Sequence, residues 1–462
     1  MSELVSKAGR ERVAKLLRDH DIQTVICAMP DLWGRLVGKR VLTKAFQEAG
    51  LGSEGLHASV YLFCVDMDMD PQDGYALTDW SRGFQDCRFV PDLSTFRLVP
   101  WMDRTAIVLC DPYDEQTGEM MPIAPRVILK QQLEKLRKVG FSLKCATELE
   151  FFLYRDSYQE AWDKRYQDLA PTSRYRADYH ILQSSVDEHF IGRVRDQINA
   201  TGVEIEFSKS EWGLGQQEIN LKYAEALEMA DRHILYKTWV KELAALDGMS
   251  ASFMAKIGIE EVGSSCHIHA SLWDARGKKP LGWDQKSSNN NISKPFNHFL
   301  GGLTSVTPEY ALLYLPTVNS YKRLQPESFA PTAIAIGLDN RTAAFRLVGH
   351  EASFRVENRV PGADVNPYLA LAAMAASGLH GIENKVTAPE PYDGNAYLDE
   401  SLASVPLRMG QAIDRFRSSS AVAASLGEDV HAHLIRFYER ELESYEKECV
   451  TDWEFFRYFE RI

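Results

Sequence analysis

The sequence has no long apolar run, and its cysteines follow no pattern. No stretch of about 18 consecutive apolar residues occurs, which excludes a membrane-spanning helix. The first residues carry charges throughout and lack the apolar centre of a secretion signal. The seven cysteines are odd in number and never spaced Cys-x-x-Cys, so neither a disulfide framework nor a thiolate metal site is indicated. We therefore expect a cytoplasmic protein with reduced, buried thiols.

A basic block is also missing. The chain has 52 Lys and Arg against 65 Asp and Glu, a formal net charge of -13. Because nucleic-acid binding needs clustered cations, we expect no nucleic-acid partner, and we expect no membrane partner either. Hydrophobic residues make up 45% and charged residues 25%, which is typical of a soluble globular protein. A length of 462 residues favours two domains.

Residues 1–110 are predicted to form a small β-rich domain. Apolar residues at helical spacing predict a helix over 10–20. Strands at 24–28 and 36–41, joined by a turn around Gly34, predict a hairpin. Turn-rich stretches separate further predicted strands at 60–65, 87–90, 95–99 and 106–110.

Residues 111–462 are predicted to form a larger domain of helices and strands, so the fold class is α+β. Pro125 near the start and Gly140 past the end bound one helix. The segment 277–293, with three consecutive asparagines, is predicted to be a solvent loop. Further helices are predicted at 187–200, 224–246, 294–303 and 367–383, and strands at 143–154, 203–207, 217–221, 267–272 and 343–358.

Four carboxylates in two segments are candidate metal ligands. Glu148 and Glu150 stand two apart in a predicted strand, which places both on one face. Taken alone, that pair also fits a solvated strand face. Glu211 and Glu218 lie at the two ends of a glycine-containing turn, a geometry that lets both converge on one point. Carboxylates that close together need a cation.

Two histidines and two arginines extend this set. A lone histidine is more often a core residue, but His267 and His269 stand at strand spacing in a chain that also offers carboxylates. Arg355, Glu357 and Arg359 alternate along one face of a predicted strand. Carboxylates, one or two histidines and several arginines favour Mg²⁺ or Mn²⁺ with a phosphate-bearing substrate. Zinc bound by thiolates does not fit.

In this order, these segments resemble glutamine synthetase from one end of the chain to the other. Each motif is weak alone, and together they identify the chain as a member of that family. The similar motifs are Gly38-Lys39-Arg40, Pro91-Asp92, Glu148-Leu149-Glu150-Phe151-Phe152, Gly215-Gln216-Gln217-Glu218, His267-Ile268-His269, Asn319-Ser320-Tyr321-Lys322-Arg323-Leu324, Asn340-Arg341, Arg355-Val356-Glu357-Asn358-Arg359 and Asn366-Pro367-Tyr368.

The resemblance implies a β-grasp N-terminal domain followed by a catalytic domain whose curved antiparallel sheet lies between ATP and glutamate. It also implies hexameric rings stacked as a dodecamer, in which a neighbour's N-terminal domain completes each active site. ATP would phosphorylate the γ-carboxylate of glutamate to an acyl phosphate, which an amine then attacks. Metals and arginines would offset the charge on the phosphoryl group.

The resemblance further implies a role for each site residue. Two or more Mg²⁺ or Mn²⁺ ions are expected, one held by Glu150, Glu211 and Glu218 and another by Glu148, His267 and Glu357. The nucleotide side would comprise His269, Ser271, Arg341 and Arg355. Glutamate would contact Gly263, Arg323 and Arg359, and the transferring phosphoryl group Arg341 and Arg346. Asp86 would remove the proton from the amine.

Three departures from the family pattern concern the amine and glutamate positions. The region 70–80 lacks the Asp-Gly-Ser-Ser stretch of ammonia-using members, and Val262 replaces an asparagine that contacts glutamate. Phe329 occupies the place of a flap glutamate, although Glu327, two residues away, is an alternative substitute. Lost charge and an added aromatic ring favour a larger organic amine: an alkylamine, ethanolamine, an aniline or a polyamine.

Four questions stay open at this point. The chain could be an ordinary glutamine synthetase that uses ammonia. A catalytically inactive scaffold is a remote alternative, since all six metal-ligand positions are filled. The acidic stretch 66–70 fits an amine entrance or a solvated turn. Tyr397 falls where some members carry an adenylylated tyrosine, and a plain loop tyrosine is the better interpretation.

Overall fold

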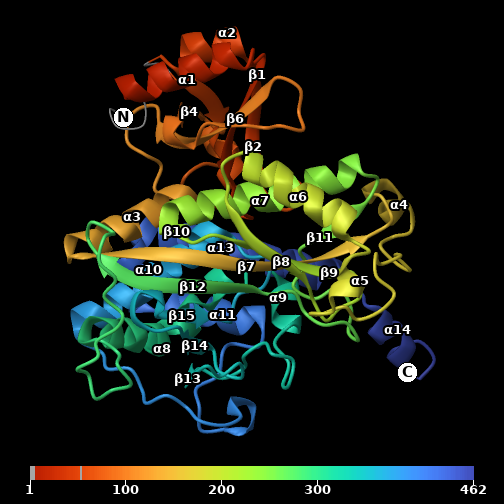
Figure 1. Ribbon diagram of the computed structural model, residues 1–462. Helices are drawn as coiled ribbons and strands as arrows, with labels where there is room; N and C mark the ends of the chain where they lie inside the picture. Colours follow the sequence, from red (N-terminus) through yellow and green to blue (C-terminus); the bar gives the residue numbers. More distant parts are fainter. Residues whose placement is uncertain (1–5, 53–54, 462) are drawn as a thin grey trace.

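The computed structural model describes residues 6–52 and 55–461, which form a small unit and a larger unit (Figure 1). The small unit carries a sheet with strand order β2-β1-β6-β4-β3, and β5 pairs with β6. Its helices and strands are α1 (Lys7–Asp19), β1 (Thr24–Pro30), β2 (Leu36–Leu42), α2 (Thr43–Ala45), β3 (Leu56–Ser59), β4 (Asp86–Pro91), β5 (Arg97–Leu98) and β6 (Thr105–Asp114).

The predicted hairpin is confirmed, because β1 and β2 pair antiparallel from Thr24 opposite Leu42 to Pro30 opposite Leu36. The predicted strand at 60–65 is wrong. Strand β3 ends at Ser59, whose hydroxyl caps a 3₁₀ turn over Val60–Phe63. The sheet also runs past residue 110, since β6 continues to Asp114 and pairs there with β4.

A sheet of nine strands forms the centre of the larger unit, with the order β13-β14-β15-β12-β7-β9-β8 and with β10 and β11 also pairing with β7. All its strand pairs are antiparallel except β13 with β14. The strands are β7 (Phe141–Tyr154), β8 (Ile205–Ser210), β9 (Gln216–Leu221), β10 (Ala224–Glu225), β11 (Ser250–Ser252), β12 (Cys266–Asp274), β13 (Ile336–Leu338), β14 (Phe345–Val348) and β15 (Arg355–Asn358).

The predicted strand over 343–358 is two strands with a turn between them. Gly349 has φ +78°, and a Cβ there would lie 2.4 Å from the carbonyl oxygen of Ser353, so the chain reverses at this glycine. The resulting strands β14 and β15 pair with each other. The helix predicted at 294–303 is also longer than expected, because α8 continues through Pro308 to Tyr314.

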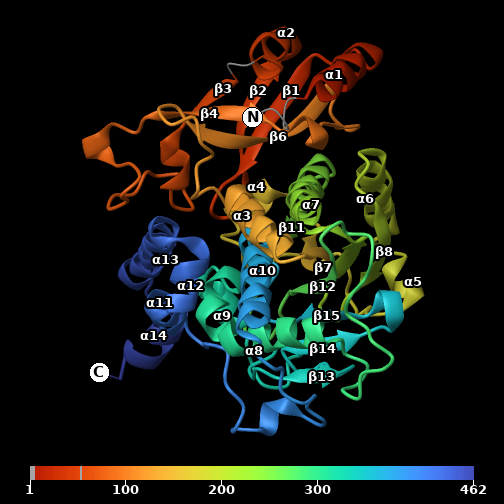
Figure 2. The ribbon, with the colours of Figure 1, turned by 90° about the vertical axis from the view of Figure 1, so that its left-hand side faces the viewer.

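Helices cover the sheet and connect it to the small unit (Figure 2). The alanine-rich α10 packs against α8, α3 and α7. The approach of α8 to α10 is close, since a Cβ on Gly302 would lie 2.0 Å from the carbonyl oxygen of Ser377. The helices are α3 (Pro125–Lys138), α4 (Tyr158–Asp163), α5 (Ile181–Ser184), α6 (Glu188–Ala200), α7 (Ala226–Leu246), α8 (Lys294–Tyr314), α9 (Val318–Lys322) and α10 (Pro367–Asn384).

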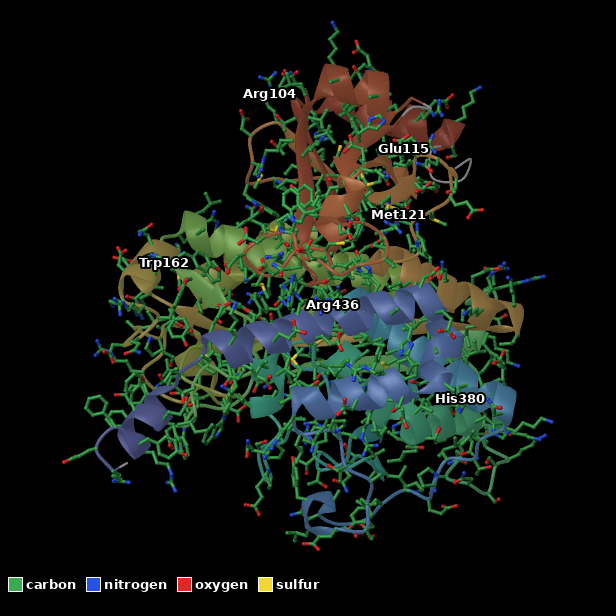
Figure 3. All side chains as sticks on the ribbon, turned by 180° about the vertical axis from the view of Figure 1, so that it is seen from behind. Arg104, Glu115, Met121, Trp162, His380 and Arg436 are labelled. Carbon is green, nitrogen blue, oxygen red and sulfur yellow. The ribbon has the colours of Figure 1, made fainter. Side chains whose placement is uncertain are left out.

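The C-terminal segment adds four helices that the sequence analysis did not predict: α11 (Met409–Ser418), α12 (Ser420–Leu426), α13 (Glu428–Glu448) and α14 (Asp452–Tyr458). Helix α13 lies across the back of the molecule, where Arg436 is seen in Figure 3. Arg436 donates to the carbonyl oxygen of Asp73, and a ring nitrogen of His433 lies 2.8 Å from the carbonyl oxygen of Phe63. Helix α13, near the C-terminal end of the chain, therefore contacts the small unit.

A buried charge network also joins the two units. Arg126 of α3 pairs with Asp92 and Asp111 of the small unit and with Asp231 of α7, each at 2.8 to 2.9 Å. Three surrounding carboxylates outweigh burial and hold the pKa of Arg126 well above its usual value. Removing one partner from such a network would leave an uncompensated buried charge. Within the described part of the chain, no helix is long and apolar enough to cross a membrane.

Candidate active site and metal centres

Strand register brings the predicted metal ligands together on the large sheet. On β7, Glu148 stands opposite His267 of β12, and Glu150 stands opposite Glu218 of β9. On the next strand pair, His269 stands opposite Glu357 of β15. Directly opposed residues in a sheet have neighbouring side chains, so four segments distant in the sequence meet on one face.

The first cluster consists of Glu150, Glu211 and Glu218, whose carboxylate oxygens lie within 4.8 Å of one another. Burial and the charge of Glu211 raise the pKa of Glu150 to about 7. Burial and the neighbouring Glu148 and Glu150 raise the pKa of Glu218 to about 9. Such raised pKa values indicate that negative charge is concentrated here. A bound cation would return these carboxyl groups to their ionised form.

The second cluster consists of Glu148, His269 and Glu357, again with ligand atoms within 4.8 Å of one another. His267 lies beside it, with Nδ1 at 3.4 Å from a carboxylate oxygen of Glu148 and from one of Glu357. Burial and the charge of Arg359 lower the pKa of His267 to about 4. A neutral imidazole at physiological pH has a lone pair free for a metal.

His269 bridges this cluster to Arg355. Its Nε2 lies 2.6 Å from Glu148, and its Nδ1 accepts a 3.0 Å hydrogen bond from Nε of Arg355. Two strand positions further, Ser271 accepts a hydrogen bond from the indole of Trp273. The structure therefore brings both histidines to Glu148, with the ring of His269 at 2.6 Å and that of His267 at 3.4 Å.

Two further arginines surround Glu357. Arg346, opposite Glu357 in the β14–β15 register, donates to one of its oxygens at 2.8 Å, and Arg359 donates to the other. Burial works against ionisation of Glu357, but His267 and Arg359 outweigh it and lower the pKa to about 2. Arg341 is exposed in the turn between β13 and β14. Cations gathered at an ionised carboxylate form a cradle for phosphoryl oxygens.

Arg323 is near enough to Glu150 of the first cluster to feel its charge, and it is only 3% exposed. It donates to the carbonyl oxygens of Val360 and Arg359, and burial lowers its pKa to about 10. Gly263 packs against its stem, since a Cβ there would lie 2.6 Å from Cγ of Arg323. Only glycine fits beside this arginine.

The segment 325–329 is an exposed flap over Arg359. Arg359 donates to the carbonyl oxygen of Phe329, whose ring is 63% exposed. Glu327 and Phe329 both have positive φ, +59° and +58°. Left-handed backbone at two non-glycine residues is costly and typical of functional loops.

Asp86 is not part of this cluster in a single chain. It is an exposed residue at the start of β4, in the small unit, whereas β12 and β15 lie in the larger unit (Figure 1). Any role for Asp86 in this chemistry therefore needs a second copy of the chain, as the sequence resemblance implies.

Several contacting residues were missed by the sequence analysis. Ser265 donates to Glu150 from its backbone and hydroxyl, and Gln216 donates to Glu150 at 3.2 Å. Lys209 forms an ion pair with Glu211 and lies over the ring of Tyr179 at 4.4 Å. Gln216 stands inside the Gly215-Gln216-Gln217-Glu218 motif, where it was given no role, and Ser265 stands two residues before His267, which was the available signal. The pairing of Lys209 with Tyr179 depends on tertiary structure.

The donor set fits hard divalent cations. Carboxylate oxygens make up most of the ligand atoms, with at most two imidazoles. No cysteine among the described residues belongs to either cluster. Mg²⁺ and Mn²⁺ prefer such ligands. Two candidate metal-binding clusters share one sheet face with several arginines, an arrangement typical of enzymes of metal-dependent phosphoryl transfer.

The comparisons with known proteins agree with this class. Residues 122–458 match the family described as "Glutamine synthetase, catalytic domain". The chain belongs to the glutamine synthetase family, and it is a member of a family of ATP-dependent ligases that form carbon–nitrogen bonds. Its α+β fold, with a small N-terminal sheet domain, is the one expected from the sequence.

Three relatives are close along their whole length. The chain is 44% identical to "Gamma-glutamylethanolamide synthetase GlnA4" of Streptomyces coelicolor over 98% of this chain and 96% of that protein. It is 36% identical to "Glutamate--isopropylamine ligase" of Pseudomonas sp over 99% of this chain and 100% of that protein. The solved structure "GmaS/ADP complex-Conformation 1" superposes with a TM-score of 0.83 at 27% identity, covering 99% of this chain and 100% of that one.

Proposed function

We propose that this protein joins the γ-carboxylate of glutamate to an organic amine, with hydrolysis of ATP to ADP and phosphate through a γ-glutamyl phosphate. The observation that carries the proposal is the exposed Phe329 on the flap above Arg359, where charge would be needed to hold ammonium. Two relatives with 36% and 44% identity are named for organic amines, which supports the same choice.

The metals would be held by the residues predicted from the sequence. Glu150, Glu211 and Glu218 converge within 4.8 Å, which supports one site. Glu148 and Glu357 supply the second site with a histidine. When bound, the metals supply charge neutralisation for the phosphoryl group. We assign His267 as the ligand and His269 to the nucleotide side, because Nδ1 of His269 accepts from Arg355, which places the proton of the neutral ring on Nε2 and leaves no lone pair toward Glu148.

Different arginines would bind glutamate, the phosphoryl group and the nucleotide. Arg323 and Arg359, with Gly263 packed against the stem of Arg323, would hold the carboxylates of glutamate. Arg346 and the exposed Arg341 would orient the phosphoryl group during transfer, and Arg355 and Ser271 would contact the nucleotide. Bidentate guanidinium groups suit both carboxylate and phosphate oxygens.

The amine must lose a proton before it attacks, and Asp86 would accept it. Since Asp86 lies in the small unit, a neighbouring subunit would supply it, which requires a homo-oligomer. The exposed aromatic residues of α14 and of its C-cap favour association: Trp453 is 60%, Phe456 85% and the C-cap Phe459 82% exposed. Two inactive variants, Asp86→Asn and Glu357→Gln, should therefore regain part of the activity when mixed subunits assemble.

The test is a panel of amines with ATP, glutamate and Mg²⁺ or Mn²⁺, with γ-glutamyl products identified by mass spectrometry. We expect at least one alkylamine, ethanolamine, aniline or polyamine to release phosphate faster than ammonium does. If ammonium is faster than every organic amine, the protein is a glutamine synthetase instead. If no amine and no ammonium stimulates phosphate release, the scaffold alternative holds.

A further inference from the structure

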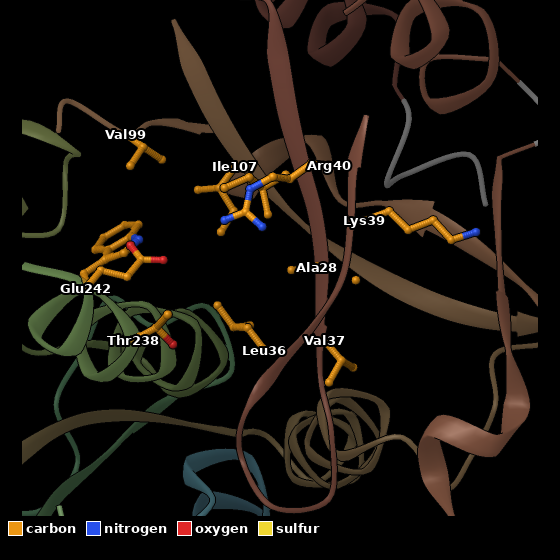
Figure 4. Close-up of a pocket in the computed structure, with 12 residues that line it drawn as sticks. Ala28, Leu36, Val37, Lys39, Arg40, Val99, Ile107, Thr238 and Glu242 are labelled. Atoms are coloured by element: carbon orange, nitrogen blue, oxygen red, sulfur yellow. The ribbon is translucent and has the colours of Figure 1, made fainter. Parts of the chain in front are cut away.

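A cavity of about 180 Å³ lies between the two units, away from both carboxylate clusters (Figure 4). One wall comes from the small sheet and includes Leu36, Val37 and Arg40 of β2. The opposite wall comes from α7 and includes Trp239 and Glu242. Water occupies roughly 30 Å³ per molecule in the liquid, so the cavity has room for one small organic molecule.

Two opposite charges face each other across this cavity. Figure 4 shows the guanidinium of Arg40 and the carboxylate of Glu242 pointing toward the space between the units, whereas the neighbouring Lys39 points away. Within the described residues no ion pair joins Arg40 and Glu242. The carboxylate of Glu242 accepts one hydrogen bond, at 3.2 Å from the indole of Trp101. Both charges therefore keep hydrogen-bonding capacity for a ligand.

The rest of the lining is mostly apolar. Val99 and Ile107 continue the wall of the small sheet, and Trp239 stands edge-on to Trp101 with ring centroids 5.3 Å apart. The hydroxyl of Thr238 is engaged by the carbonyl oxygen of Ile234 within the helix. A ligand would thus meet one cation, one anion and an aliphatic or aromatic surface. Burial raises the pKa of Glu242, which an ammonium partner would offset.

We propose that this cavity binds a small α-amino acid with an apolar side chain, its carboxylate on Arg40 and its ammonium group on Glu242. A free amino acid is the small molecule whose two opposite charges and apolar substituent match all three parts of the lining. The bound molecule connects β2 of the small unit to α7 of the larger unit. The site is independent of the ligase reaction, since none of its residues belongs to the candidate active site.

The test is calorimetric titration of the full chain with L-valine. Saturating glutamate and Mg²⁺, without ATP, keep the glutamate position of the active site occupied. We expect L-valine to bind the unchanged protein and to bind the Arg40→Gln and Glu242→Gln variants at least about tenfold more weakly. Lys39→Gln is the matched control on the same strand, and it should bind L-valine within about twofold of the unchanged protein.

A second comparison uses the unchanged protein and so does not depend on the folding of any variant. The carboxylate 3-methylbutanoate has the valine skeleton without the ammonium group, and it should bind at least about tenfold more weakly. The proposal is overturned if L-valine does not bind, if 3-methylbutanoate binds equally well, or if both variants retain the affinity. Because no step requires catalysis, these outcomes are separate from the amine panel.

Discussion

The hydroxyl of Tyr397 donates a 3.0 Å hydrogen bond to the carbonyl oxygen of Ala330. Ala330 is buried and directly follows the exposed flap 325–329. The tyrosine is half-buried, and burial raises the pKa of its hydroxyl, so the group stays a donor. Tyr397 therefore fixes one end of the flap that carries Phe329.

Tyr397→Phe removes this hydrogen bond and keeps the ring. A buried hydrogen bond contributes about 1 kcal/mol, so kcat/KM for the acceptor amine should fall by about fivefold. The KM of ATP should change less, since the flap carries none of the residues assigned to the nucleotide. Steady-state kinetics with each substrate varied in turn measures the difference. Tyr166→Phe, at an exposed ring, is the control; an equal effect there would contradict the role of Tyr397.

Gly263→Ala tests the glutamate position. The added Cβ would lie 2.6 Å from Cγ of Arg323 and 3.0 Å from the carbonyl oxygen of Ala255, so Arg323 must shift. We expect the KM of glutamate to rise by about tenfold or more, because displacement of a positioning group is costly. Gly258→Ala is the matched control, since a Cβ there comes no closer than 3.5 Å to Glu261. An unchanged KM in both variants would argue against Arg323 as a glutamate ligand.

Much of the site could be predicted from the sequence, because its residues stand in short motifs at strand spacing. Glu148 and Glu150 lie on one face of β7 as the two-residue spacing indicated. The register of strand pairing could not be predicted from the sequence. It places Glu150 opposite Glu218 by pairing segments that are distant in the chain. The same holds for the cavity between Arg40 and Glu242, whose walls are about 200 residues apart in the chain.

The errors in the fold have local causes. The predicted strand at 60–65 is apolar, but the Ser59 cap turns the chain into a 3₁₀ helix before it can pair. The predicted strand over 343–358 spans Gly349, whose positive φ reverses the chain. Helix α13 has buried Val430, Leu434, Phe437 and Tyr438 at the spacing that indicates an amphipathic helix.

Glu218→Gln tests the first metal site. Three carboxylates meet there, and in the absence of metal their repulsion raises the pKa of Glu218. The variant should bind Mn²⁺ at least about tenfold more weakly, because a charged ligand is lost. It should also unfold at a higher temperature than the unchanged protein when both are metal-free at pH 7, because glutamine does not have to take up a proton on folding, as Glu218 with its raised pKa must. Glu206→Gln, exposed on β8, should change neither the affinity nor the unfolding temperature.

His433 predicts an acid-sensitive contact between the units. Burial lowers its pKa to about 4, against about 6.5 in an unfolded chain, although its hydrogen bond with Phe63 acts the other way. The folded protein binds fewer protons between these values, so stability is lost as pH falls from about 6.5 toward 4, by about 1.4 kcal/mol per pH unit. His433→Gln should reduce the drop in thermal midpoint between neutral and acidic buffer. His189→Gln, exposed on α6, is the control, and equal drops in all three proteins would refute the assignment.

Phe329→Glu tests why the acceptor should be an organic amine. Position 329 has φ +58°, and glutamate carries the same backbone strain as phenylalanine there, so the variant changes charge and bulk rather than flap conformation. Its carbonyl oxygen stays available to Arg359. A carboxylate on the flap favours ammonium, and loss of the ring removes an apolar contact for a substituted amine. The ratio of kcat/KM for ammonium to that for the best organic amine should therefore rise by about tenfold or more. Leu407→Glu adds the same charge at an exposed position outside the flap and should leave the ratio unchanged. A ratio that is also unchanged in Phe329→Glu would mean that the acceptor is selected elsewhere, by the residues that surround Lys209 and Tyr179 or by a neighbouring subunit.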